Sequence, residues 1–152
     1  MSAGDPSARK EGEGFDRMVP REIFFQLLDM EVKRARRYQN FFCVLLLKLT
    51  QLSNQDAGAR RADCYRRLSH LLKEEFRESD ILGRLGENCI AALLPYGDAA
   101  AGEQTKSRFE GNLKYFDFPH EGYQVQVEQI LFPMDGTSSS DLIQKVVHFG
   151  EA

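Results

Sequence analysis

The apolar run from Phe42 to Leu49 most limits what this chain can fold into. Lys48 is the one residue in the run that is not apolar. A short run of this kind predicts a strand buried on both faces of its sheet. Such a strand needs cover on both sides, so the chain must supply a layer of helices for each face. A chain of 152 residues is long enough for one domain of this type.

Helical and extended patterns alternate along the rest of the chain. The apolar spacing predicts four helices, over residues 20–38, 59–76, 99–113 and 138–147. Two short apolar runs, 81–85 and 89–94, enclose the turn Gly86-Glu87-Asn88 and predict a β-hairpin. Residues 123–132 alternate between apolar and polar side chains, which predicts a half-exposed strand. We therefore expect an α/β sandwich, with a central mixed sheet flanked by helices.

The charge pattern gives no reason to expect nucleic acid as a partner. The net charge is −3. This balance does not show the excess of basic residues that binding to nucleic acid favours. The segment 59–76 carries a group of arginines, namely Arg60, Arg61, Arg66 and Arg67. Asp63 interrupts this group, so a solvated helix face is favoured over a patch that binds RNA or an acidic partner.

The N-terminal segment, the lengths of the apolar runs and the cysteine spacing indicate the expected compartment and argue against a zinc site. Residues 1–14 are small, polar and charged, which predicts a disordered tail ahead of a domain over residues 15–150. No apolar run approaches the ~20 residues that span a bilayer, so we expect a cytoplasmic chain without a membrane partner. The three cysteines, Cys43, Cys64 and Cys89, are scattered and predict free thiols rather than zinc ligands.

The order and spacing of several motifs resemble the GGDEF family of bacterial diguanylate cyclases. The motifs are Arg34–Tyr38, the apolar strand, Arg77–Asp80, Arg84–Pro95 and Phe132–Gly136. Over about residues 16 to 147, the resemblance implies a five-stranded sheet of the nucleotide-cyclase palm type. Members of the family make cyclic di-GMP from two GTP molecules, each held by one protomer of a dimer.

The residues at the catalytic positions depart from the family pattern. In the family the first strand ends in an aspartate that binds magnesium, and here Lys48 stands at that position. The signature hairpin, Gly-Gly-Asp/Glu-Glu-Phe in the family, reads Gly86, Glu87, Asn88, Cys89 and Ile90. The resemblance places Glu87 at a glycine that lies against phosphate and Cys89 at a metal-binding glutamate. An ammonium and a thiol supply none of the hard oxygen ligands that magnesium requires.

Two further departures concern GTP binding. The loop that recognises guanine in the family is shorter here, and Asn54 and Asp56 are its remaining candidates. In the family the C-terminal helix carries basic residues that grip GTP phosphates, and we expect this grip to be missing here, where the sequence ends in His148-Phe149-Gly150-Glu151-Ala152. Phosphoryl transfer depends on positioning and charge neutralisation. We therefore expect a degenerate domain that is no enzyme and has no magnesium cofactor.

An inhibitory-type site for cyclic di-GMP is the functional feature that the resemblance leaves in place. In the family an Arg-x-x-Asp precedes the signature by five residues, and Arg77 and Asp80 have this spacing. Arg108 matches a second arginine from the following helix. A guanidinium can donate to the N7 and O6 edge of guanine, and a carboxylate can accept from its N1 and N2 donors. Together these residues predict binding of an intercalated cyclic di-GMP dimer.

A structural explanation of the same residues stays open. Arg60-Arg61-Ala62-Asp63 also satisfies the motif by chance. Arg77 can cap the preceding helix and pair with Asp80, while Arg108 can be a solvated helix residue. Two functions follow: an effector that binds cyclic di-GMP, or a protein-interaction scaffold that keeps only the fold. Either one implies a partner signalling protein, and a homodimer is also compatible with the sequence.

Overall fold

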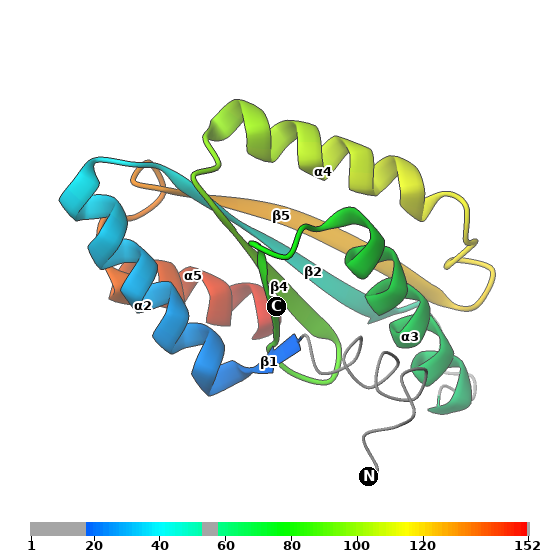
Figure 1. Ribbon diagram of the computed structural model, residues 1–152. Coiled ribbons are helices and arrows are strands. Elements are labelled where there is room, and N and C mark those ends of the chain that lie inside the picture. The colour runs from blue at the N-terminus through cyan, green and yellow to red at the C-terminus, as the bar shows by residue number, and fades with distance from the viewer. Residues whose placement is uncertain (1–17, 53–57, 152) are drawn as a thin grey trace, which may run out of the picture.

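The computed structural model describes residues 18–52 and 58–151, which form one five-stranded mixed sheet between two layers of helices. The elements in chain order are β1 (Met18–Pro20), α2 (Arg21–Tyr38), β2 (Phe42–Gln51), α3 (Gly58–Glu75), β3 (Ile81–Arg84), β4 (Cys89–Pro95), α4 (Ala99–Leu113), β5 (Tyr123–Phe132) and α5 (Ser139–Glu151). Helices α2 and α5 cover one face of the sheet, and α3 and α4 cover the other (Figure 1). This confirms the predicted α/β sandwich.

Strand β2 lies inside the sheet, as its apolar run predicts. The strand order is β1-β3-β4-β2-β5, and β2 pairs antiparallel with both β4 and β5. The residues from Phe42 to Leu47 are fully buried. Val44 and Leu46 point into the core under α2 and α5, whereas Leu45 and Leu47 point into the core under α3 and α4. The alternation of a strand thus divides one apolar run between two cores.

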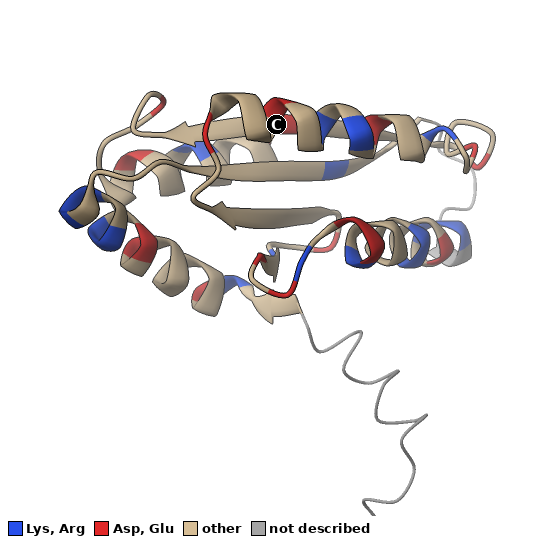
Figure 2. Ribbon diagram, turned by 45° about the horizontal axis from the view of Figure 1, so that its top comes forward, with Lys and Arg blue, Asp and Glu red and all other residues tan. Residues whose placement is uncertain are grey.

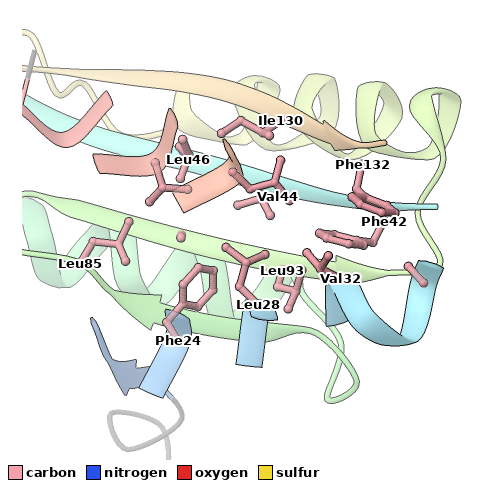
Figure 3. Close-up of a cluster of buried hydrophobic side chains, with 14 of the residues drawn as sticks. Phe24, Leu28, Val32, Phe42, Val44, Leu46, Leu85, Leu93, Ile130 and Phe132 are labelled. Carbon is pink, nitrogen blue, oxygen red and sulfur yellow. The ribbon is translucent and has the colours of Figure 1, made fainter. Parts of the chain in front are cut away.

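The core under α2 and α5 joins elements that lie far apart in the sequence. Figure 3 shows Phe24, Leu28 and Val32 of α2 against side chains from β2, β4 and β5. These three residues recur at helical spacing and are almost completely buried. The rings of Phe42 and Phe132 stack at a centroid distance of 5.0 Å across the β2–β5 pair. This packing fixes α2 against the sheet.

Helix ends agree with local capping chemistry. The carboxylate of Asp98 accepts a hydrogen bond from the Ala101 N–H at 2.8 Å and begins α4. The predicted cap of the last helix is confirmed, because the Ser138 hydroxyl accepts from the Asp141 N–H at 3.1 Å. Near the C-terminal end of α2, basic residues gather (Figure 2), including Arg36 and Arg37 in the last turn. Cations there stabilise the helix through its macrodipole.

Apart from shifts of one residue at the ends of elements, the structure differs from the sequence prediction at β1, β2 and α5. It adds β1, a three-residue strand that pairs in parallel with β3. It extends α5 to Glu151 rather than Val147 and β2 to Gln51 rather than Leu49. Strand β1 escaped prediction because three residues show no period, and its parallel pairing depends on tertiary contacts. The predicted tail over residues 1–14 lies outside the described residues.

No helix in the described part of the chain has both the length and the apolar character needed to cross a membrane.

Candidate functional site

Arg77 and Asp80 form a closed turn between α3 and β3. The Arg77 backbone N–H donates to the Asp80 carboxylate (Oδ2) at 2.9 Å, and the Asp80 N–H donates to the Arg77 carbonyl at 3.0 Å. The carboxylate therefore bonds the backbone of Arg77 in this turn. These two bonds fix the loop that presents both side chains beside the start of β3.

Arg108 of α4 is bonded to the end of α3, next to this turn. Its Nε donates to the carboxylate of Glu75, the last residue of α3, and forms an ion pair with it. The Asn112 side-chain amide donates to the other oxygen of Glu75 at 2.8 Å. Glu75 is 9% exposed and Arg108 is 58% exposed. The bond to Glu75 uses Nε, and a guanidinium has four further N–H donors.

All three predicted ligand residues line one hollow of about 330 Å³. The hollow lies between the turn after α3, the loop after β4 and the outer side of α4. Its volume is at the lower end of the range for small-molecule sites, which is about 300–1,000 Å³. Tyr96, which the sequence analysis did not single out, also lines this hollow. The structure thus brings Arg77, Asp80 and Arg108 together, as their spacing predicts.

Lys48 and Cys89 face each other at the position that the GGDEF resemblance assigns to the metal. They are directly paired across β2 and β4. The Leu49 N–H donates to the Asn88 carbonyl at 2.8 Å, so the Lys48–Cys89 pair is of the non-hydrogen-bonded kind. Side chains in such pairs approach each other more closely. Both side chains lie on the sheet face that α2 and α5 cover.

A second hollow, of about 320 Å³, surrounds this pair and includes Arg21 from α2, Glu87 from the signature turn and Glu151 from α5. Burial raises the pKa of the Cys89 thiol to about 11, although the positive charges of Lys48 and Arg21 partly oppose the rise. Cys89 is therefore a neutral thiol at pH 7. A thiol and an ammonium do not fit a magnesium ion, which takes oxygen ligands.

The signature turn is bonded to α3. Arg61 donates to the Asn88 side-chain oxygen at 3.3 Å and forms an ion pair with Glu87 at 3.5 Å. The arginines of α3 are thus not purely solvated, since Arg66 also pairs with Asp63 and Arg67 lies over the ring of Phe116. Glu87 and Asn88, at the second and third signature positions, thus both contact Arg61 of α3.

Other predicted features give no ligand cluster. Among residues 18–52 and 58–151, no group of three or more His, Cys, Asp and Glu side chains could hold a metal ion. Asn54 and Asp56, the candidates for guanine recognition, lie outside the described residues. Ile90 is fully buried in the core under α3 and α4, so the last signature position has a packing role.

The family assignment rests on the chain's match to a known sequence profile. The profile described as "Diguanylate cyclase, GGDEF domain" matches residues 17–146. The chain belongs to the GGDEF family. No curated protein matches the chain. The GGDEF assignment agrees with the five-stranded mixed sheet and its two helical layers.

Solved GGDEF structures share this fold at low sequence identity. The GGDEF domain of YfiN (TpbB) from Pseudomonas aeruginosa is 17% identical with a TM-score of 0.73, over 86% of each chain. The GGDEF domain of DgcB from Caulobacter crescentus, in complex with c-di-GMP, is 13% identical with a TM-score of 0.66, over 86% of this chain and 80% of that one. The diguanylate cyclase SiaD from Pseudomonas aeruginosa, in complex with its activator SiaC, is 15% identical with a TM-score of 0.62. The match covers 85% of this chain and 52% of that one.

Proposed function

We propose that this chain is a GGDEF domain without cyclase activity that binds cyclic di-GMP as an effector. The observation that carries the proposal is the single hollow lined by Arg77, Asp80 and Arg108. These residues come from two separate segments, and a structural role in one turn does not require the arginine from α4. The DgcB domain, whose structure contains c-di-GMP, has the same fold.

Loss of catalysis is supported by the side chains at the end of β2 and in the signature turn. Lys48 carries a positive charge where a metal would need an anion, and the Cys89 thiol is protonated. Glu87 adds a side chain at the glycine position and is bonded to Arg61. Phosphoryl transfer works through bound metal ions and positioned phosphates. This group of residues supplies neither of them.

The chemistry of the hollow suits a guanine base. Asp80 uses Oδ2 to hold the backbone of Arg77, which leaves its second oxygen to accept from N1 and N2 of guanine. Arg108 is held by Glu75 through Nε and has further donors to offer to N7 and O6. The hollow's modest volume suits the base end of the ligand, with the rest of the dinucleotide lying over the surface.

A protein-interaction scaffold is the alternative, and one observation favours it. The Arg108 guanidinium pairs with Glu75, and the Asp80 carboxylate bonds the Arg77 backbone, so both side chains already have partners within the chain. The SiaD structure contains an activator protein bound to a chain with this fold. In either case we propose that a partner signalling protein takes part.

Calorimetric titration with cyclic di-GMP distinguishes the two functions. We expect the wild-type chain to bind with a Kd of about 1 µM or tighter, which corresponds to about −8 kcal/mol. Arg77→Ala should abolish the heat of binding. Arg66→Ala is the matched control, because Arg66 pairs with Asp63 on α3 and does not line the hollow. If the wild-type chain gives no heat at excess ligand, the effector role is contradicted and the scaffold is the function that remains.

A further inference from the structure

We infer that Tyr96 is the base-stacking residue of the cyclic di-GMP site, an inference that rests on the proposed function. Arg77, Asp80 and Arg108 can contact the edges of a guanine and do not cover its face. Tyr96 lines the same hollow as Arg77, Asp80 and Arg108. Its side chain is 68% exposed. An aromatic ring in this place can stack on a purine base, whichever edge of the base the other residues contact.

The backbone of Tyr96 has a conformation that is costly for a bulky residue. Its φ angle is 62°, in the left-handed region. Bulky side chains rarely adopt this region, whereas glycine adopts it without cost. Strained residues of this kind gather at ligand sites, and here the strained residue lines a hollow that has independent binding chemistry.

The ring of Tyr96 is held in place from α2. The Arg34 guanidinium lies over the ring, with its carbon 4.2 Å from the ring centroid. Glu31, only 11% exposed, fixes the guanidinium by accepting hydrogen bonds from both Nε and Nη2. This hydrogen-bonded ion pair raises the pKa of Arg34, which therefore stays charged. Arg34 is thus a positioning residue that supports one side of the ring.

Edge and face recognition together select a planar base with guanine's donors and acceptors. Arg77, Asp80 and Arg108 read the edge of the base, and Tyr96 covers its face. Stacking of a base on an aromatic side chain is sequence-tolerant, so Tyr96 adds affinity while the other three residues give specificity.

Tyr96→Gly separates binding from folding. Glycine relieves the strain at φ 62°, so we expect the melting temperature to stay the same or to rise. The Kd for cyclic di-GMP should weaken about 5-fold or more, because stacking on one base is lost. Tyr96→Phe keeps the ring and should bind like the wild type. Tyr115→Gly is the matched control, since Tyr115 is 89% exposed and does not line the hollow.

A fluorescence titration observes the stack directly. The chain has no tryptophan, so Tyr96→Trp introduces a single reporter at the site. Cyclic di-GMP should quench its emission at the same ligand concentrations that give the calorimetric Kd. Tyr115→Trp should show no saturable quenching. This pair also tests the inference if Tyr96→Gly fails to fold.

The outcomes separate the two proposals. Both proposals are supported if the wild type binds, Tyr96→Gly binds more weakly and, of the two tryptophan variants, only Tyr96→Trp is quenched. Equal Kd values for the wild type and Tyr96→Gly, or equal quenching of both tryptophan variants, contradicts the role of Tyr96 and leaves the effector intact. Absence of binding to the wild type contradicts the proposed function and the role of Tyr96 with it.

Discussion

Lys48 of β2 lies directly opposite Cys89 of β4, as a non-hydrogen-bonded pair of two adjacent antiparallel strands. In a GGDEF cyclase these two positions correspond, by the resemblance of the motifs, to the acidic residues that hold the metal. Here they hold an ammonium and a thiol whose pKa burial raises to about 11. The pair therefore presents an ammonium and a neutral thiol to the hollow and offers no carboxylate oxygen.

The double variant Lys48→Asp/Cys89→Glu should regain metal affinity. Two carboxylates in a close cross-strand pair repel each other and provide oxygen ligands for magnesium. We expect a lower melting temperature than wild type in EDTA and a rise when magnesium is added. At a Kd of about 1 mM, 10 mM magnesium stabilises the folded state by about 1.4 kcal/mol. Magnesium should leave the wild-type melting temperature unchanged, and no rise in the variant would contradict this placement of the pair.

Neither the wild type nor that double variant should turn over GTP. Glu87 and Asn88 remain in the signature turn of both proteins, bonded to Arg61. Restored metal ligands alone do not position the phosphates. Chromatography after incubation with GTP and magnesium should show no cyclic di-GMP, with an active GGDEF cyclase as the positive control. Product from the wild-type chain would refute the loss of catalysis.

Gly83 and Gly86 offer a matched pair of substitutions in and next to β3. A Cβ at Gly83 would lie 2.5–2.8 Å from atoms of the Phe24 side chain, whereas one at Gly86 has no atom within 4 Å. Gly83→Ala should therefore overpack the α2 core and destabilise the fold by about 1–3 kcal/mol. Gly86→Ala should stay within about 0.5 kcal/mol of wild type. Urea unfolding measures both, and equal stabilities would argue against this docking of α2 on β3.

Stability should fall with rising pH because burial raises the pKa of all three buried thiols, Cys64 as well as Cys43 and Cys89. Burial raises the pKa of Cys43 to about 12 and that of Cys89 to about 11. In the unfolded chain a thiol loses its proton near pH 8.5, so the folded state binds more protons above that pH. The free energy of unfolding then decreases as pH rises from about 8.5 to 11, by at most about 1.4 kcal/mol per pH unit for each thiol.

Urea titrations at pH 8, 9 and 10 test this dependence on the thiols. The control is the double variant Cys43→Ala/Cys89→Ala, which lacks two of the three groups and should show a shallower decrease. The same decrease in both proteins would assign the effect to other groups.

The sequence predicted the sheet best where one strong pattern decides the structure. The run at Phe42–Leu49 became the buried strand β2, and the alternation over 123–132 became β5. It missed β1 because Met18–Pro20 pairs only through contacts with residues 82–84 of β3. No local pattern encodes a parallel partner some sixty residues away in the chain.

The same division holds for the site. Spacing to the hairpin proposed Arg77 and Asp80 and a count along the chain added Arg108, and all three line one hollow, while their role as ligand residues stays a prediction. Tyr96 could not be predicted, since its positive φ and its contact with Arg34 arise from the tertiary structure. Arg61 was assigned to a solvated face because its partners, Glu87 and Asn88, follow more than twenty residues later.

Amide chemical-shift mapping by NMR, with cyclic di-GMP titrated into the 15N-labelled chain, shows which of the two hollows binds the ligand. We expect saturable shifts at Arg77, Asp80, Tyr96 and Arg108, with little change over Gly86–Ile90. No shifts at excess ligand, or shifts confined to Gly86–Ile90 and Lys48, would contradict the proposed cyclic di-GMP site.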